Sequence, residues 1–164
     1  MTVHIIANTN FGKATGPEDE FISHEDTIIH DWSRLVDEDD LVIHLGDVLA
    51  NGFSSAERYL PLLPGRVLLT RSPKDNIALD PGNRLYGWIC VDRFELRYQG
   101  RMLRFSHYPC SPATADLNIV ARLPDKASSD ASPSPAANIL VFADQAGPLP
   151  LDTWLNNAPS ASTD

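Results

Sequence analysis

The sequence predicts an α/β fold with a parallel sheet at its centre. The segment 41–52, LVIHLGDVLANG, begins with a short apolar run that is typical of a buried parallel strand. A second apolar run, 3–7, precedes it, and apolar residues recur at helical spacing in 23–36, between the two runs. Strand, helix and strand in this order predict a right-handed parallel crossover. Gly46 and Asp47 follow the central strand, at the edge where open α/β sheets place their ligands.

The length and composition predict one soluble domain. The chain of 164 residues can bury a sizeable core, and we assign 1–155 to one domain and 156–164 to a flexible tail. A formal net charge of −9 repels phosphate backbones and argues against a nucleic-acid partner. Cys90 and Cys110 lack the spacing of metal ligands or of a disulfide framework. Because no stretch is long enough for a membrane span and no signal peptide is recognisable, we expect a cytoplasmic protein with reduced thiols and no membrane partner.

The rest of the chain adds one further helix and several short strands. Ser23 is expected to cap the first helix, and the acidic run 37–40 to form its solvated end. The segment 113–123 is predicted to be weakly helical, and the Ser-, Pro- and Ala-rich segment 126–137 to be a mobile loop. The further helix is predicted at 56–62, and the remaining strands at 66–70, 88–91, 94–98, 101–105 and 138–142, with a hairpin turn at Gln99 and Gly100.

Five of the predicted strands are each followed by a polar loop. Parallel strands bring their carboxyl ends to one edge of a sheet, so we expect these loops to build one crevice. His4 and His44 lie within strands and are expected to be packed in the interior, whereas His24 and His30 are expected on the surface of the first helix. The five polar loops begin at Asn8, Asp47, Ser72, His107 and Asp144.

The order of these motifs resembles the calcineurin-like metallophosphoesterases, in particular their small bacterial and phage members. The likeness is clearest in LVIHLGDVLANG, in the Pro64-Gly65-Arg66 turn with the strand that follows, and in RFSHYP at 104–109. The resemblance implies two facing sheets flanked by helices, an αββα sandwich. It also implies two divalent metals bridged by the carboxylate of the Gly-Asp motif, and hydrolysis of phosphate esters by a metal-bound hydroxide.

Three of the family's motifs are altered in this chain. Residues 8–10 read Asn-Thr-Asn where the family has Asp-x-His, and 72–75 read Ser-Pro-Lys-Asp where it has Gly-Asn-His-Asp. Residues 143–146 read Ala-Asp-Gln-Ala where it has Gly-His-x-His. Of the ligands in the matched motifs, only Asp47 and His107 are unchanged. Asp75 also matches, at a position that does not bind metal in the family.

These changes remove charge and ligand groups from the site that the resemblance implies. Asn8 keeps the size of an aspartate without its negative charge, Asn10 cannot act as an imidazole, and Pro73 has no ligand group. Lys74 replaces the family's substrate-facing histidine with a point charge that can neutralise a carboxylate or contact a phosphate. Asp144 can still offer a carboxylate. The resulting vestigial crevice comprises Asn8, Asn10, Asp47, Pro73, Lys74, Asp75, His107 and Asp144.

Two functions follow from this comparison. We expect a catalytically degenerate domain without a cofactor, retained as a binding or regulatory protein whose partner is a protein or a small phosphorylated ligand. The alternative is a phosphoesterase with a reduced site, in which Asp47 and His107 hold one Mn, Zn, Ni or Fe ion with help from Asn8 and Asp144. Without any ion, Asp47 would cap the turn that follows it and His107 would be a hydrogen-bonded residue of the crevice.

Overall fold

Two β-sheets and three α-helices form the described part of this computed structural model. No helix in that part combines the length and apolar character needed to cross a membrane. The residues that the structure describes are 1–12, 18–50, 53–75, 84–110, 115–121, 139–142 and 147–157.

The larger sheet has six strands in the order β10-β1-β2-β3-β5-β4. Its four central strands run parallel, and they are β1 (Val3–Ile6), β2 (Leu41–His44), β3 (Arg66–Thr70) and β5 (Trp88–Val91). The two outer strands are antiparallel to their neighbours, and they are β4 (Arg84–Leu85) and β10 (Leu149–Pro150). The predicted parallel crossover is thereby confirmed, as is the central strand predicted at the start of 41–52, which ends at His44.

The smaller sheet has four strands in the order β6-β7-β8-β9. The first two form an antiparallel hairpin, and the others pair in parallel. Gln99 and Gly100 connect the hairpin with φ angles of 48° and 79°, as expected for a tight two-residue turn that fits the twist of the strands. The strands are β6 (Arg93–Tyr98), β7 (Arg101–Ser106), β8 (Leu117–Val120) and β9 (Ile139–Val141).

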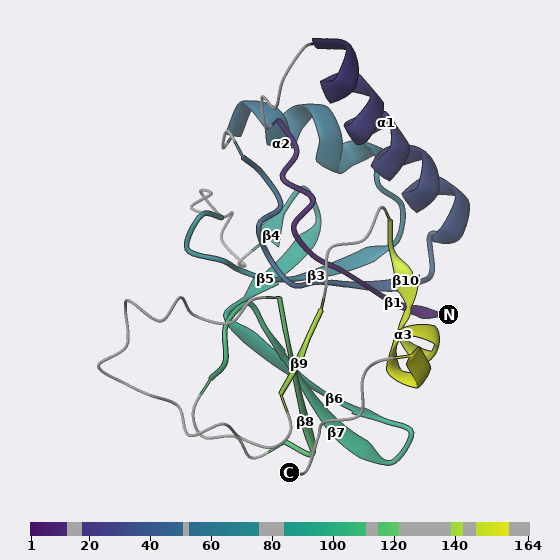
Figure 1. Cartoon of the computed structure of the whole chain (residues 1–164), viewed down its shortest axis with the longest axis vertical. Coiled ribbons are helices and arrows are strands. Elements are labelled where there is room, and N and C mark those ends of the chain that lie inside the picture. The colour runs from purple at the N-terminus through teal and green to yellow at the C-terminus, as the bar shows by residue number, and fades with distance from the viewer. Residues whose placement is uncertain are drawn as a thin grey trace.

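Helices cover one face of the larger sheet (Figure 1). They are α1 (Glu18–Leu35) and α2 (Phe53–Tyr59), which continues into the 3₁₀ helix η1 (Leu60–Leu62). Trp32 of α1 is fully buried between helix and sheet, stacks on Trp88 at 6.1 Å, and donates its indole N–H to the carbonyl of Pro64 at 2.9 Å. The large ring therefore buries its apolar surface without leaving its donor unpaired.

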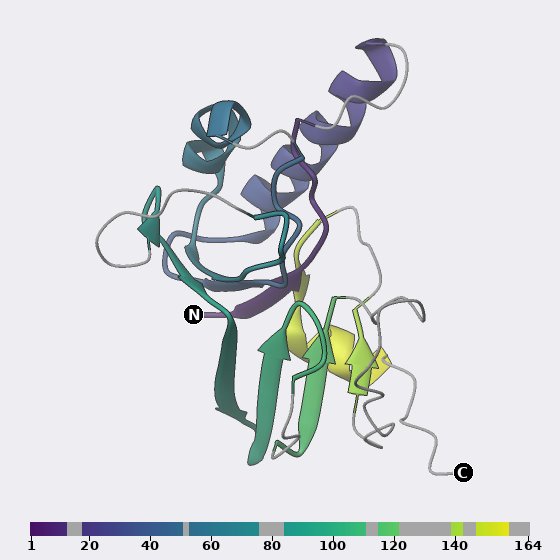
Figure 2. The same cartoon turned by 90° about the vertical axis from the view of Figure 1, so that its left-hand side faces the viewer.

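A second core lies between the two sheets. Ile5 and Ile43 of the larger sheet and Phe105 and Ile119 of the smaller sheet are fully buried in it. Each such side chain contributes roughly 1.5–3 kcal/mol when it is removed from water. Helix α3 (Leu151–Asn157) adds Trp154 to this core, and Figure 2 shows the helix beside the strands of the smaller sheet. In the part that the structure describes, no helix forms a fourth layer on the outer face of that sheet.

Several local predictions were wrong. Helix α1 begins at Glu18, so Ser23 lies inside the helix and cannot cap it. Residues 117–120, predicted as part of a weak helix, form strand β8, because pairing with strands on both sides outweighs a weak local preference. Strand β10 and helix α3 were not predicted. Asn156 belongs to α3 rather than to the tail, whose residues from 158 lie outside the described ranges, as does the predicted loop 126–137.

The acidic run 37–40 is only partly solvated. Asp37 is exposed as predicted, but Asp40 is 5% exposed. Its carboxylate accepts hydrogen bonds from the backbone N–H of Thr2 at 2.5 Å and from Nε2 of His4 at 3.1 Å. His4 is buried, as expected for a histidine within a strand. Asp40 therefore fastens the first strand to the start of β2.

Candidate functional site

The loops that follow β1 and β2 remain side by side beyond the ends of the strands. The N–H of Asn8 donates to the carbonyl of Gly46 at 3.0 Å, and the N–H of Asn10 to the carbonyl of Asp47 at 2.9 Å. A third bond, from Phe11 to the carbonyl of Val48, is 2.8 Å long. Asn8 and Asn10 have φ angles of 56° and 46°, a left-handed conformation that asparagine tolerates better than most residues. Two of the predicted crevice residues are thereby held at the edge of the sheet.

The turn at Gly46 and Asp47 requires its glycine. Gly46 has a φ of 99°, and a Cβ at this position would lie 2.6 Å from Nδ1 of His107 and 2.9 Å from the carbonyl oxygen of Thr70. Since both distances are below any ordinary carbon contact, a larger residue would push the loops apart. The close approach also brings the end of β7 against the end of β2. Loops of both sheets therefore meet at this turn.

Asp75 joins the loop after β3 to the loop after β2. Its carboxylate accepts hydrogen bonds from the backbone N–H groups of Asp47 at 3.0 Å, Val48 at 2.9 Å and Ser72 at 2.8 Å. The side chain is buried, and three donors occupy its two oxygens. Asp75 is thus a structural anchor of the crevice.

His44 supports the same turn from inside the core. The N–H of Gly46 donates to its Nδ1 at 3.1 Å, so the ring proton lies on Nε2 and is donated to Oγ1 of Thr9 at 3.1 Å. Thr9 in turn donates to the carbonyl of Val48 at 3.0 Å. Burial lowers the pKa of His44 from 6.5 to about 4, so the ring is neutral at pH 7. The expected interior position of His44 is confirmed. Its hydrogen bond to the turn was not predicted from the sequence. The position of His44, two residues before Gly46, was the one feature that could have indicated it.

Glu25 of α1 fixes the far end of the loop after β1. Its carboxylate accepts a hydrogen bond from the backbone N–H of Gly12 at 2.6 Å and another from the hydroxyl of Tyr59 on α2. Burial and the contact with this carboxylate raise the pKa of Tyr59 to about 12. Phe11 stacks on the same tyrosine ring, with 5.0 Å between the centroids. The loop is therefore held against both helices.

Asp47 is the charged centre of the crevice. Its side chain is 3% exposed, and its carboxylate lies between two groups that can carry positive charge. Oδ1 is 3.8 Å from Nε2 of His107, and Oδ2 is 3.7 Å from Nζ of Lys74. Nδ1 of His107 donates to the carbonyl of Leu45 at 2.7 Å, so Nε2 is the ring nitrogen that faces Asp47. Within the described chain, Oδ1 of Asp47 has no hydrogen-bond partner.

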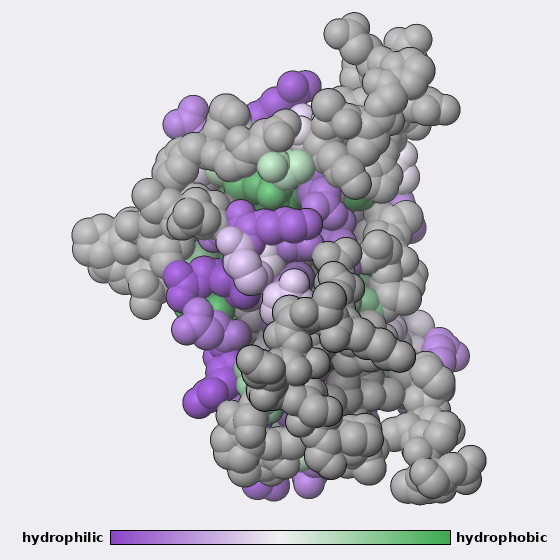
Figure 3. All heavy atoms as spheres, turned by 60° about the vertical axis from the view of Figure 1, so that its left-hand side comes forward, coloured by the Kyte–Doolittle hydropathy of each residue, from purple (hydrophilic) through white to green (hydrophobic). Residues whose placement is uncertain are grey.

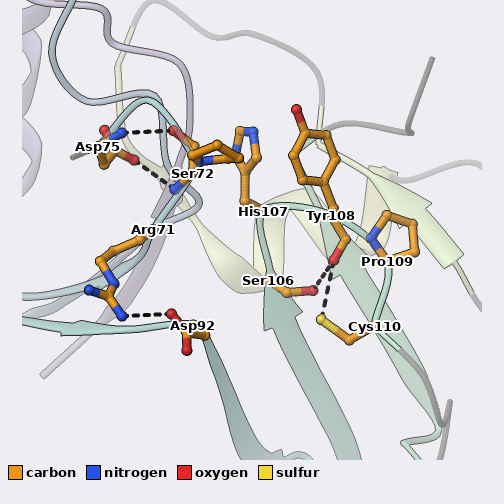
Figure 4. A pocket seen from close by; sticks show the side chains of 10 residues that line it. Arg71, Ser72, Asp75, Asp92, Ser106, His107, Tyr108, Pro109 and Cys110 are labelled. Carbon is orange, nitrogen blue, oxygen red and sulfur yellow. Dashed lines mark hydrogen bonds and ion pairs between the residues drawn. The ribbon is translucent and has the colours of Figure 1, made fainter. Parts of the chain in front are cut away.

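A cavity of about 430 Å³ opens beside His107 (Figure 4). One wall carries Arg71, whose Nη2 pairs with Asp92 at 2.7 Å. The other wall is the segment that follows β7, where the Tyr108 ring meets the His107 ring edge to face at 4.5 Å. Cys110, a free thiol, donates to the carbonyl of Tyr108. Figure 3 shows the molecule from the side on which the sheet strands end, and hydrophilic residues gather in the middle of this face.

The structure brings together most of the predicted crevice. Asn8, Asp47, Asp75 and His107 converge through the contacts above, whereas Asp144 lies outside the described residues. Asn10 turns its amide back onto the carbonyl of Asn8 at 2.8 Å. Pro73 and Lys74 form the exposed tip of the loop after β3.

The described residues do not supply the ligands of a two-metal centre. Among them, no group of three or more His, Cys, Asp or Glu side chains lies close enough to hold one ion. Catalytic metal sites ordinarily use three protein ligands for each ion, and Asp47 with His107 provides two. Lys74 also places a positive charge where a cation would meet Asp47. The observed donors and charges therefore do not fit the metals that the family implies.

Comparisons with known proteins support the fold alone. No protein-family model matches this sequence, and no curated protein matches it significantly. The crystal structure of a protein of unknown function from Aquifex aeolicus is similar, with a TM-score of 0.62 and 18% sequence identity. The match covers 94% of this chain and 98% of that chain. The two chains thus have similar α/β architectures over nearly their whole lengths.

Proposed function

We propose that this chain is a catalytically degenerate metallophosphoesterase-like domain that binds a small phosphorylated ligand without hydrolysing it. Two facing sheets, with a Gly-Asp turn and a histidine meeting at the ends of their strands, support the resemblance to that family. The observation that carries the proposal is the surroundings of Asp47. Within the described residues, the basic groups less than 4 Å from its carboxylate are Lys74 and His107, and no third side chain of the metal-ligand type completes a site with Asp47 and His107.

The absence of hydrolysis follows from charge. In the family, metal ions lower the pKa of a bound water so that hydroxide forms at neutral pH. Among the described residues, the carboxylate of Asp47 and the imidazole of His107 are too few to offset the charge of two divalent ions. Asp75, the other carboxylate buried nearby, already accepts three backbone hydrogen bonds.

The cavity favours a small anionic ligand. Its volume of about 430 Å³ is within the range of small-molecule sites. Nε of Arg71 is buried and has no hydrogen-bond partner in the described chain, and its ion-pair partner Asp92 has a side chain that is 86% exposed. A phosphate can displace such an exposed carboxylate and take the planar guanidinium in two-point contact. Lys74, with a side chain that is 65% exposed, can add a second positive charge.

Binding of phenyl phosphate, measured by isothermal titration calorimetry, tests the proposal. We expect binding to the unmodified protein and a loss of about tenfold or more in Arg71→Met, since a hydrogen bond to a charged group contributes about 1.5–3 kcal/mol. Arg97→Met removes an exposed arginine of strand β6 and serves as the matched control. Equal binding by both variants, or none by the unmodified protein, would contradict a phosphate site at Arg71.

One observation favours the alternative function, a phosphoesterase with a reduced site. Oδ1 of Asp47 and Nε2 of His107 lie 3.8 Å apart, and this carboxylate and imidazole are the residues that would hold a single Mn, Zn, Ni or Fe ion. Metal-dependent turnover that is abolished by Asp47→Ala would establish this alternative and exclude the degenerate domain.

A further inference from the structure

We propose that the ammonium group of Lys74 takes the electrostatic place of a divalent cation beside Asp47, so that the positive charge of this crevice is built into the chain. This inference rests on the proposed function, because it treats the crevice as a vestigial metal site. It adds a second cause for weak metal binding: besides the ligands missing from the neighbouring loops, the positive charge of Lys74 repels cations.

The first step is the need of Asp47 for positive charge. A carboxylate whose side chain is 3% exposed must be compensated by donors or cations. Its backbone N–H is bonded to Asp75, and its Oδ1 has no hydrogen bond within the described chain. Nδ1 of His107 donates to the carbonyl of Leu45, and its Nε2 lies 3.8 Å from Oδ1, beyond hydrogen-bond distance. Oδ1 therefore has no hydrogen bond from His107, and the ammonium group of Lys74 is the other basic group beside this carboxylate.

The second step is the position of Lys74. The lysine follows Pro73, and its backbone N–H donates to Oγ of Ser72 at 3.2 Å. Asp75, the next residue, is anchored by backbone donors of two loops. The start of the side chain is thus fixed, and its length carries the ammonium to 3.7 Å from Oδ2 of Asp47. The charge reaches a buried carboxylate from the solvent side.

The third step is a comparison with the other ion pairs. Arg66 and Arg71 bind Asp39 and Asp92, carboxylates whose side chains are 85% and 86% exposed. Among the Lys and Arg ion pairs of the described residues, that of Lys74 is the one whose carboxylate is buried. Water screens the exposed pairs, so their charges matter little. Near a buried carboxylate, a unit charge within 4 Å is a strong competitor of any other cation.

Binding of Mn²⁺, measured by electron paramagnetic resonance of the free ion, tests this inference. Lys74→Met removes the charge and keeps most of the stem, Lys74→Arg keeps the charge, and Arg66→Met removes a charge from an exposed ion pair at the other end of the sheet. We expect Lys74→Met to bind Mn²⁺ at least about tenfold more tightly than the unmodified protein. Lys74→Arg and Arg66→Met should bind no more tightly than the unmodified protein.

The location of the ion completes the test. In Lys74→Met, Mn²⁺ should broaden the NMR signals of the His107 ring and leave those of the exposed His30 ring sharp. Equal affinities of Lys74→Met and the unmodified protein, or an equal gain in Arg66→Met, would overturn the inference. These results are independent of turnover: hydrolysis by the unmodified protein would refute the proposed function, whereas the variants measure competition at Asp47. Since Lys74 is largely exposed, its substitution is not expected to prevent folding.

Discussion

Two buried aspartates flank strand β2, and their surroundings differ. Asp40 precedes the strand, and its carboxylate accepts close hydrogen bonds from the N–H of Thr2, the N–H of Asp37 and Nε2 of His4. Asp47 follows the strand; among the described residues, its carboxylate lies 3.7 Å from Nζ of Lys74 and 3.8 Å from Nε2 of His107. The hydrogen bonds from Thr2 and Asp37 lower the pKa of Asp40 to about 2.

The difference separates a structural carboxylate from one available to a ligand. Asp40 uses its oxygens to close the amino-terminal end of the sheet, so nothing is left for a ligand. Asp47 is equally remote from solvent but keeps Oδ1 without a hydrogen bond in the described chain, at the end where α/β sheets bind ligands. Unsatisfied buried polar groups are uncommon in folded proteins and call for a functional explanation.

The largest loss of stability is expected from Asp75→Ala, which removes the carboxylate that holds the loops together at the crevice end of β2. The backbone N–H groups of Asp47, Val48 and Ser72 would lose a charged acceptor, at a cost on the order of 4 kcal/mol in the free energy of unfolding. Urea unfolding followed by circular dichroism measures this loss. A loss below about 1 kcal/mol would mean that Asp75 does not hold the loops together.

As the pH is lowered, we expect protonation of His44, at the crevice end of β2, to reduce the free energy of unfolding before protonation of Asp40 does. The unfolded chain binds a proton at this residue near pH 6.5, and the folded chain only near pH 4. Between these values the unfolded state holds more protons, so stability falls as the pH falls, by about 3 kcal/mol in total. The contribution of Asp40, whose pKa is lowered from 3.8 to about 2, is lost only below pH 3.8.

Urea midpoints between pH 7 and 4.5 measure the effect of His44. The variant His44→Gln should be less stable at pH 7, because it disturbs the bonds to Gly46 and Thr9, and its stability should depend less on pH. An unchanged pH dependence in this variant would show that His44 is not the group that titrates.

A smaller effect with opposite signs is expected from replacing each aspartate by asparagine. Asp40→Asn should lower the urea midpoint. The amide NH₂ of asparagine would replace one carboxylate oxygen and would point at an N–H group that now donates a hydrogen bond to that oxygen. Asp47→Asn should leave the midpoint unchanged or raise it, since a buried charge with distant partners disappears and asparagine tolerates the φ of 55°. Similar decreases of the urea midpoint in both variants would show that the two aspartates do not differ in their contribution to stability.

Much of the fold could be predicted from the sequence because apolar runs and turn residues indicate strands directly. No knowledge of distant contacts was needed to predict strands from the apolar runs at 41–45 and 66–70, or a turn at Gln99 and Gly100. Strand β8 was missed because its stability comes from β7 and β9, which are neighbours only in the folded chain. Asp40 was assigned to solvent for the same reason: two of its three donors, His4 and Thr2, lie 36 and 38 residues away.

The candidate site was predictable in part of its membership but not in its contacts. The loop positions predicted that Asp47 and His107 share one crevice, and the resemblance placed Lys74 there. The structure brings these three together although β2 and β7 belong to different sheets. Which oxygen of Asp47 meets which cation, and that Asp75 is fully occupied, depends on a few ångströms of loop geometry. The relay from His44 to Thr9 also joins residues 35 positions apart and has no local sequence pattern.

Hydrolysis of p-nitrophenyl phosphate and bis-p-nitrophenyl phosphate tests the central claim most directly. Purified protein is assayed with Mn²⁺, Ni²⁺ or Zn²⁺, beside an Asp47→Ala variant made in the same way. The ligand groups that the described residues place around Asp47 are too few to hold two ions, so both proteins should show only the background rate. Metal-dependent turnover by the unmodified protein that is lost in Asp47→Ala would contradict a degenerate domain and establish a working phosphoesterase.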